Sequence, residues 1–425
     1  MDNEQMIIEN GKLKIENAGL PKGWEVKKLV DVCIVERGSS PRPIKEFLTN
    51  DENGVNWIKI GDTKNVDKYI YSTNQKITKK GAEKSRFVEE GDFILSNSMS
   101  FGKPYIMKTK GYIHDGWFKL KLHDFIDTEY FYQLLSSPYV NEQFHNLASG
   151  AVVKNISGDL VKKVVLPIPP LPEQKRIVSM LDRAFEAIDK AKANAEQNLK
   201  NAKELFESYL QGVFSNGKLK IENGEWEEKM LEQISDVFGR GKSRHRPRND
   251  KKLYGGKYPF IQTGDIRNCN HYITDYSQTY NEIGLAQSKL WPKGTICITI
   301  AANIAETGIL SFDACFPDSV IGIVVNKKIA DLDFVEYLLQ SFRVKIQSLG
   351  KGSAQDNINM GTFKNKLFPF PLVKEQKQIV KKLDALSAET KKLEAIYQQK
   401  IDDLEELKKS ILQKAFMGEL TMSVP

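Results

Sequence analysis

The feature that most constrains this chain is a long internal repeat. The segment EQKRIVSMLD begins at Glu173 and returns as EQKQIVKKLD at Glu375, and each copy follows a proline-containing break. Aligning 173–214 with 375–416 at a constant offset of 202 gives 16 identities in 42 positions without a gap. Periods of about 20 to 50 residues indicate solenoids, so a period this long indicates duplicated domains instead.

The repeat also extends upstream of the two helix-like segments. DVCIVERGSSPRP corresponds to DVFGRGKSRHRP, WIKIGD to FIQTGD, and SGAVVKNIS to KGSAQDNIN. At 425 residues the chain is long enough for two or three domains. We therefore predict an N-terminal extension (1–19), a first globular domain (20–169), a first long helix (170–216), a second globular domain (217–370), and a second long helix with a C-terminal tail (371–425).

Both repeated segments carry a narrow apolar stripe typical of coiled coils. Steps of four and three residues alternate, and both stripes shift once at the same place. Alanines in the first stripe match large residues in the second, which favours pairing of the two helices with each other. A 42-residue helix would be about 63 Å long. The alternative is that each helix packs only on its own domain. The predicted interface residues are Ile177, Leu181, Ile188, Leu199, Leu205, Ile379, Leu383, Leu393, Ile401, Leu404 and Ile411.

Short β-type runs, including VNWIKI, DFILS, TICITI and VIGIVV, fill both globular domains and are separated by Gly, Asn and Asp. The predicted fold class is α+β. It consists of two mainly-β domains in a pseudo-twofold arrangement, separated by an antiparallel coiled coil of the two long helices. This geometry suits a DNA duplex with two half-sites.

The charge distribution points to the loops of the globular domains. The net charge is +7, and both long helices are nearly neutral. The loop GRGKSRHRPRNDKK, Gly239–Lys252, contains seven Lys/Arg and one Asp between Arg240 and Lys252. We interpret it as a contact to DNA phosphates, and arginine can also pair with guanine in the major groove. The alternative is a solvated basic loop without a ligand.

Polar residues in other loops are candidates for base contacts, although a turn or capping role is the alternative for each of them. The predicted DNA-binding residues are Ser39, Ser40, Arg42, Lys59, Asn97, Ser98, Ser100, Lys103, Lys154, Asn155, Arg240, Lys242, Ser243, Arg244, Arg246, Arg248, Gln262, Asn303, Gln355 and Asn357.

The sequence lacks the signatures of common catalytic and cofactor sites, including GxGxxG, GxxxxGK[ST] and GxSxG. Its four cysteines and five histidines are scattered, so we expect neither a disulfide framework nor a metal site. No apolar run approaches the ~20 residues of a membrane span, and the N-terminus is unlike a signal peptide. We therefore expect a cytoplasmic, non-catalytic protein that does not contact membranes.

With these residues in hand, the chain resembles the specificity subunit of type I restriction-modification enzymes over nearly its full length. The resemblance rests on the two EQK helix starts, the glycine loops RGSSPRP and RGKSRHRP, and the GD turns at Gly61 and Gly264, in the same order twice. The first glycine loop commonly has threonine before proline in that family. Ser40 and the longer KSRHRP depart from that pattern.

The resemblance implies a non-catalytic reader of double-stranded DNA. Each target-recognition domain would read one part of a split, asymmetric target, and the helix length would set the gap between the parts. Two DNA methyltransferase subunits would dock near the helices and methylate adenine, and restriction (translocase/nuclease) subunits would join them. S-adenosylmethionine, ATP and Mg²⁺ are expected on those partners, with no cofactor on this chain. A stand-alone bipartite DNA-binding regulator and a coiled-coil protein scaffold are the alternatives.

Overall fold

The computed structural model describes residues 20–64, 66–97, 102–148, 157–216, 226–301, 304–350 and 360–420 of the chain. The chain divides into two compact units, which we call the first unit (Met1–Ala195 with Gln399–Pro425) and the second unit (Glu196–Gln398). Each unit contains one β-rich domain and a part of both long helices, α6 (Leu171–Asn216) and α11 (Val373–Phe416).

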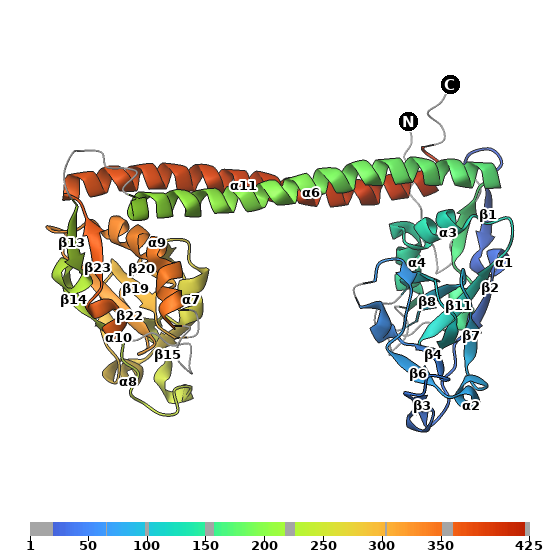
Figure 1. Cartoon of the computed structure of the whole chain (residues 1–425), viewed down its shortest axis with the longest axis horizontal. Coiled ribbons are helices and arrows are strands. Elements are labelled where there is room, and N and C mark those ends of the chain that lie inside the picture. Colours follow the sequence, from blue (N-terminus) through green and yellow to red (C-terminus); the bar gives the residue numbers. More distant parts are fainter. Residues whose placement is uncertain are drawn as a thin grey trace. The chain divides into compact units, whose positions relative to one another are not determined.

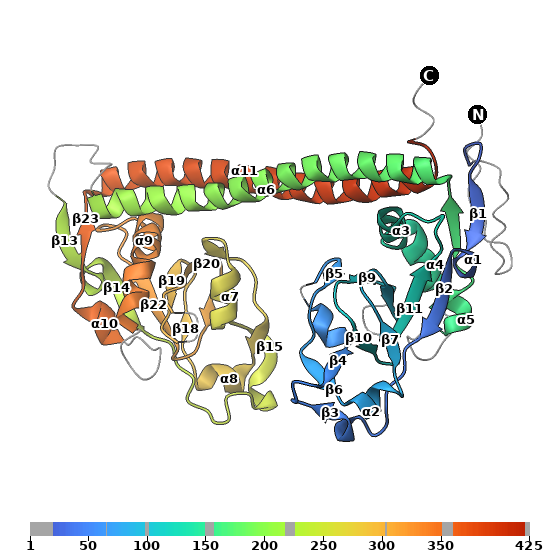
Figure 2. The same cartoon turned by 45° about the vertical axis from the view of Figure 1, so that its right-hand side comes forward.

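The first domain is built on two five-stranded sheets (Figures 1 and 2). The central strand β8 (Phe93–Ser96) is buried along its whole length, since Phe93, Leu95 and their neighbours pack on both faces of the sheet. In spatial order, one sheet contains β2 (Cys33–Arg37), β11 (Trp117–Leu122), β8 (Phe93–Ser96), β9 (Pro104–Met107) and β5 (Tyr69–Ile70). The other contains β3 (Leu48–Thr49), β6 (Gln75–Ile77), β4 (Val55–Ile58), β10 (Gly111–Ile113) and β7 (Arg86–Val88). The helical segments are α1 (Leu29–Val32), η1 (Ile44–Glu46), η2 (Ile60–Thr63), α2 (Lys79–Ala82), α3 (Thr128–Leu135), α4 (Pro138–Ala148) and α5 (Gly158–Val161).

The second domain repeats this plan with one strand fewer among the described residues. One sheet contains β14 (Ser235–Arg240), β22 (Val320–Val325), β19 (Thr295–Thr299), β20 (Thr307–Leu310) and β16 (Tyr272–Ile273). The other contains β17 (Gln278–Tyr280), β15 (Tyr254–Phe260), β21 (Ala314–Cys315) and β18 (Leu290–Trp291). The helical segments are η3 (Leu231–Ile234), η4 (Lys251–Leu253), α7 (Thr263–Asn268), α8 (Glu282–Ala286), α9 (Leu332–Gly350) and α10 (Met360–Lys364). The duplication predicted from the sequence is therefore confirmed at the level of strand order.

A two-stranded antiparallel ribbon closes each domain next to its long helix. In the first domain β1 (Glu25–Lys28) pairs with β12 (Val165–Ile168), and Glu25 lies opposite Ile168. In the second domain β13 (Glu227–Met230) pairs with β23 (Leu367–Phe370), and Glu227 lies opposite Phe370. Both residues of the second pair are 202 positions beyond those of the first, so the ribbon keeps the offset of the sequence repeat.

The repeated EQK motif has a clear structural role, because its glutamine anchors each long helix to its own domain. Gln174 is fully buried; its Oε1 accepts from the backbone N–H of Asp127 at 2.7 Å, and its Nε2 donates to the carbonyl of Pro169 at 2.9 Å. Gln376, also fully buried, makes the same two contacts with Asp331 at 2.7 Å and Pro371 at 2.8 Å. A buried amide that satisfies backbone groups on both sides fixes where the helix leaves the domain.

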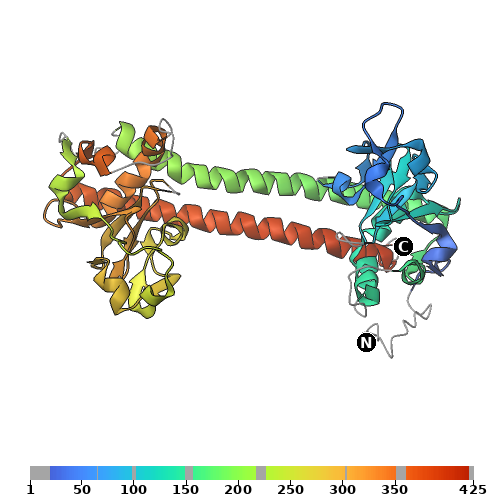
Figure 3. The same cartoon turned by 90° about the horizontal axis from the view of Figure 1, so that it is seen from below.

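Within each unit the segments of α6 and α11 run side by side in opposite directions (Figures 1 and 3). In the first unit Lys192 pairs with Glu405 at 2.7 Å, and Asp189 pairs with Lys408 at 2.9 Å. From the first ion pair to the second, the residue number falls by three on α6 and rises by three on α11, so the two helices are antiparallel. Pairing of the two helices with each other is thus confirmed. The first turns of each helix also join the core of their own domain, so each long helix packs on its domain as well as on the other helix.

Most of the predicted helix-interface residues are shielded from solvent. Six are buried and three are half-buried, and the two remaining predictions, Leu205 and Leu393, are wrong because these side chains are 50% and 39% exposed. The aromatic ring of Phe206 packs against Tyr337 of α9, with ring centroids 6.1 Å apart, and so sets the rotation of α6. Leu205 is one residue, about 100°, away from that face. The buried residues are Ile177, Leu181, Ile188, Ile379, Leu383 and Ile401, and the half-buried ones are Leu199, Leu404 and Ile411.

The position of Leu393 follows from its neighbours on α11. Thr390 is only 2% exposed, and Tyr397 is half-buried. These two residues are seven positions apart and define the covered face, so Leu393 lies at its solvent edge, about 60° from Thr390. The helices α3 and α9 lie between the long helices and the sheets (Figures 1 and 2). Tyr130 of α3 contacts Phe416 of α11, with ring centroids 5.5 Å apart.

Candidate nucleic-acid interface

The basic loop of the second domain, Arg240–Lys252, begins where β14 ends. It passes tightly against the turn between β21 and β22: a Cβ added at Gly241 would lie 2.3 Å from the carbonyl oxygen of Phe316 and 2.4 Å from that of Pro317. The backbone N–H of Gly241 donates to the carbonyl of Val320 at 2.9 Å. Only glycine allows this close approach. The close packing of the loop against this turn therefore requires the glycine of the RGKS motif.

Asp318, in the same turn, binds two of the arginines that we predicted as DNA contacts. Arg240 donates from Nε to the backbone carbonyl of Asp318 at 2.8 Å. Arg248 donates from Nη2 to both carboxylate oxygens of Asp318, at 2.7 and 2.9 Å. We call this arrangement the arginine–aspartate clasp. It fixes two long cationic side chains before any ligand arrives, so their ordering entropy is already lost in the free chain.

The rest of the loop folds partly on itself, and several of its cations remain exposed to solvent. Arg246 donates from Nη1 to the carbonyls of Ser243 and His245, at 2.7 and 2.8 Å. A hydrogen bond from His245, with further donation from the Lys252 backbone, lowers the pKa of Asp250 to about 2. Within the described part of the chain, the exposed side chains of Lys242 and Arg244 form no ion pair.

The first domain carries the same clasp around Asp115, between β10 and β11. Arg37 donates from Nε to the backbone carbonyl of Asp115 at 3.4 Å, and Arg42 lies 3.4 Å from its carboxylate. A Cβ at Gly38 would lie 2.0 Å from the carbonyl oxygen of His114. Ser40 donates to Asp115 Oδ1 at 2.6 Å, and this hydrogen bond is the main reason that the pKa of Asp115 is lowered.

Neither Asp115 nor Asp318 is among the DNA-binding residues predicted from the sequence. A signal was present: Arg37 and Asp115 are separated by 78 residues, and so are Arg240 and Asp318. An arginine and an aspartate at the same separation in two copies of a repeat indicate a contact that the fold preserves, and here the arginine donates to the aspartate backbone carbonyl in both copies. The clasp is therefore part of the duplicated plan, whereas the density of cations around it differs between the domains.

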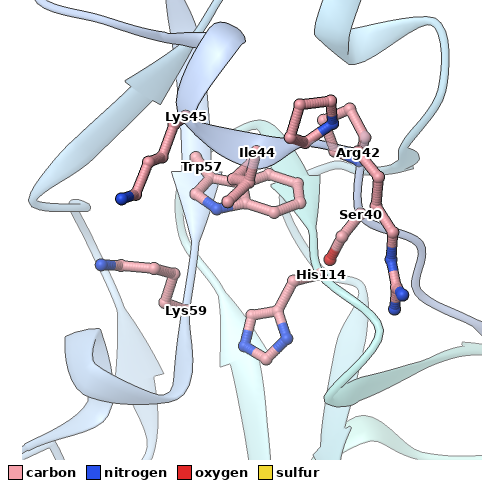
Figure 4. A pocket seen from close by; sticks show the side chains of 9 residues that line it. Ser40, Arg42, Ile44, Lys45, Trp57, Lys59 and His114 are labelled. Carbon is pink, nitrogen blue, oxygen red and sulfur yellow. The ribbon is translucent and has the colours of Figure 1, made fainter.

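The structure brings Ser40, Arg42 and Lys59 together, since all three line one open pocket of the first domain (Figure 4). Ser39 instead donates to the carbonyl of Lys84 at 2.9 Å. Asn97 is 3% exposed and donates to the carbonyl of Asp115 at 2.8 Å, so its side chain supports the clasp turn from inside.

The remaining candidates are dispersed. Lys103 donates to the carbonyl of Val66 at 3.1 Å, Gln262 donates to Gln278 at 2.7 Å, and Ser243 is buried at 5% exposure. Seven predicted residues lie outside the described part of the chain: Ser98, Ser100, Lys154, Asn155, Asn303, Gln355 and Asn357. Their DNA contacts stay predictions.

Among the described residues, no three His, Cys, Asp or Glu side chains are grouped so that they could hold a metal ion. In the same residues, no helix combines the length and the apolar character needed to cross a membrane.

Comparisons with known proteins agree with the duplicated architecture. The sequence model of the family described as "Type I restriction modification DNA specificity domain" matches residues 21–200 and again residues 223–403. The chain is 23% identical over 419 residues to the type I restriction enzyme MjaIX specificity subunit of Methanocaldococcus jannaschii, covering 94% of each chain. It is 25% identical to the EcoBI specificity subunit of Escherichia coli, covering 88% of this chain and 82% of that protein.

Solved structures share the fold. A chain from a study described as "Structural basis underlying complex assembly and conformational transition of the type I R-M system" superposes with a TM-score of 0.73 at 19% identity, covering 94% of this chain and 99% of that one. The HsdS subunit from Thermoanaerobacter tengcongensis superposes with a TM-score of 0.59, also at 19% identity, covering 94% and 98%. The double match to the sequence model spans most of the protein, and the chain therefore belongs to the type I restriction modification DNA specificity family.

Proposed function

We propose that this chain reads a bipartite, asymmetric DNA target, one part with each β-rich domain, and positions enzyme subunits on that target without catalysing a reaction itself. The observation that carries the proposal is the clasp, which occurs in both domains and whose contact from arginine to the aspartate backbone carbonyl spans 78 residues in each. The residues that surround the clasp differ between the two domains. The loop Arg240–Lys252 of the second domain contains seven Lys/Arg, whereas the first domain has a less basic loop beside a pocket. Different loops on one scaffold suit two different half-site sequences.

Three exposed cations of the basic loop suit two different roles. Lys242 and Arg244 have no ion pair within the described residues and suit contacts with phosphates, which supply affinity but no sequence information. Arg248 is held by Asp318 while its side chain remains 49% exposed. A preoriented guanidinium suits the two-point recognition of guanine in the major groove.

The experiment that tests this function is equilibrium binding of the chain, assembled with its methyltransferase subunits, to target and scrambled duplexes across a range of salt concentrations. We expect preferential binding of the target and a steep fall of affinity with salt, because phosphate contacts release counterions. Equal affinity for both duplexes would reject the proposal. Binding by the isolated chain that no partner changes would favour a stand-alone regulator.

The partners in this proposal are two DNA methyltransferase subunits and the restriction subunits. They would carry S-adenosylmethionine, ATP and Mg²⁺, while this chain contributes target recognition. The long helices offer a repeated docking point. Leu205 and Leu407 are equivalent positions of the repeat, and both are exposed, at 50% and 47%. Apolar side chains exposed at the same place in both copies suit two copies of one partner.

The docking point is tested with Leu205→Glu and Leu407→Glu. Each change should remove one methyltransferase subunit from the purified complex, and the double variant should remove both. Gln211→Glu with Gln413→Glu, at two exposed equivalent positions on the same helices, is the matched control. Full assembly of the double leucine variant would exclude this surface.

A further inference from the structure

The first domain contains an open pocket of about 810 Å³ that the proposed function does not yet explain. Its lining comes from three segments that the fold brings together: the clasp loop from Ser40 to Lys45, the end of β4 with Trp57 and Lys59, and His114 after β10. Figure 4 shows Ile44 beside the ring of Trp57, His114 on the opposite side, and the amino groups of Lys45 and Lys59 at one edge.

The floor of this pocket is apolar and uncharged. Trp57 is 2% exposed and forms the base of the pocket, while Ile44 is half-buried beside it. Burial lowers the pKa of His114 below its ordinary value of 6.5, despite the nearby Asp115, so its ring is neutral at pH 7. The backbone N–H of Gly116 also donates to Nδ1 of His114 at 2.7 Å. A charged group would lose its hydration here without a counter-charge on the floor.

The rim, in contrast, is cationic. The side chain of Arg42 is 82% exposed, and Asp115 lies 3.4 Å from it. Neither Lys45 nor Lys59 forms an ion pair with another described residue. The pocket therefore combines an apolar, aromatic floor with positive charge at the entrance. The complementary ligand is a neutral ring system joined to anionic groups that stay outside.

The second domain differs at the corresponding place. Phe260 is the sequence equivalent of Trp57, and its ring is stacked on Tyr280 with centroids 4.0 Å apart and planes 23° from parallel. Gln262 takes the place of Lys59 and donates to Gln278. Trp57 and Phe260 are both buried, at 2% and 5% exposure, so the two domains differ in what surrounds the ring: an open pocket edged by lysines in the first domain, and a stacked tyrosine beside a glutamine pair in the second.

We propose that the pocket of the first domain holds one DNA nucleobase that is turned out of the base stack, with the adjoining phosphates on Arg42, Lys45 and Lys59. This inference rests on the proposed function and extends it. Extruding a base costs pairing and stacking energy, which apolar and aromatic contacts in a pocket offset. The asymmetry of the two domains predicts that only the half-site read by the first domain contains such a base, apart from the adenines that a methyltransferase itself extrudes.

The test is a mismatch scan of the target duplex, bound by the chain in complex with its methyltransferase subunits. At each base pair except those of the methylated adenines, the base opposite the candidate is replaced so that the pair is broken. Breaking the pair of the extruded base removes part of the cost, so affinity should rise about tenfold at one position of the first half-site. This increase in affinity should disappear in the Ile44→Asp variant, because the new carboxylate would lie beside the apolar floor of the pocket.

Ile34→Asp is the matched control, since Ile34 is a 52% exposed isoleucine of the same domain outside the pocket. It should retain the gain. If Ile44→Asp does not fold, Lys45→Ala with Lys59→Ala carries the test and should reduce the gain at least threefold. If no mismatch raises the affinity, or if the pocket variants keep the increase, the inference is overturned. Preferential binding of the target by the chain would remain unaffected by that result. Loss of target preference altogether would overturn the proposed function as well.

Discussion

Arg248 directs Nη2 at both carboxylate oxygens of Asp318, although the two residues are 70 positions apart in the sequence. Both side chains are more than a third exposed, so the ion pair adds little to the stability of the fold. The ion pair instead orients Arg248, because it holds the guanidinium in one place above the turn that also binds Arg240. A reading group that is ordered in advance loses less entropy when DNA binds.

Asp318→Asn should therefore reduce discrimination more than affinity. We expect the ratio of target to scrambled DNA binding to fall about tenfold, because a free Arg248 still attracts phosphate but no longer presents a fixed edge to a base. Competition binding measures this ratio. Asp275→Asn makes the same charge change at an exposed site of the same domain and should leave the ratio unchanged. An Asp318→Asn variant with full discrimination would show that the clasp has no part in reading.

Lys242→Ala with Arg244→Ala should weaken binding to target and scrambled DNA alike. Removal of two phosphate contacts should reduce the slope of log affinity against log salt by about 2. The slope is obtained from titrations at several salt concentrations. Lys327→Ala with Lys328→Ala, two exposed residues outside the loop, removes the same charge and serves as control. An unchanged slope in the loop variant would reject these side chains as phosphate contacts.

Gly241→Ala should destabilise the second domain by about 1–3 kcal/mol, because the added methyl group would meet the backbone carbonyls of Phe316 and Pro317. Gly264→Ala is the matched control, since nothing lies within 4 Å of a Cβ at that position. Thermal unfolding of the two variants provides the comparison. Equal midpoints would show that the loop does not need its close approach to the turn.

The stability of the second unit should depend on pH through His271. Burial alone would lower the pKa of this imidazole, but hydrogen bonds and charge from Asp333 and Glu336 raise it to about 9. Its side chain is 13% exposed, and Glu336 is fully buried. The folded chain therefore holds a proton that an unfolded histidine, with a pKa of 6.5, releases earlier. The resulting stabilisation is complete below pH 6.5 and is lost as the pH rises through 9.

The expected loss between pH 6.5 and 9 is about 3 kcal/mol, from the 2.5-unit difference between the two pKa values. Calorimetry across this range detects it as a falling unfolding midpoint. His271→Gln should lower stability at pH 6.5 and remove most of the dependence, whereas His123→Gln in the first domain should not affect this transition. An unfolding midpoint that does not change with pH in the unaltered chain would contradict the interaction of a protonated His271 with these carboxylates.

The repeat made much of the fold predictable from the sequence. A constant offset of 202 requires the two halves to share strand order, and the ribbons β1–β12 and β13–β23 keep that offset. The alternating stripes predicted the paired helices. They could not fix the rotation of α6 near Leu205, because the contact between Phe206 and Tyr337 joins residues far apart in the chain.

The candidate site was less predictable for a related reason. Composition identified the basic loop, but it could not show which arginines are already engaged. Arg248 is paired with an aspartate 70 residues away, and Arg246 donates hydrogen bonds to carbonyls of its own loop. The sequence gives charges and spacing, whereas the availability of a cation depends on neighbours that only the folded chain brings near.

The most direct measurement maps methylated adenines in DNA from cells that carry this chain and from cells in which residues 20–169 are exchanged for the first domain of a relative. The account predicts that one part of the split target changes and the other part stays the same. A methylation pattern that does not change, or a target in which both parts change together, would contradict the claim that each domain reads its own part.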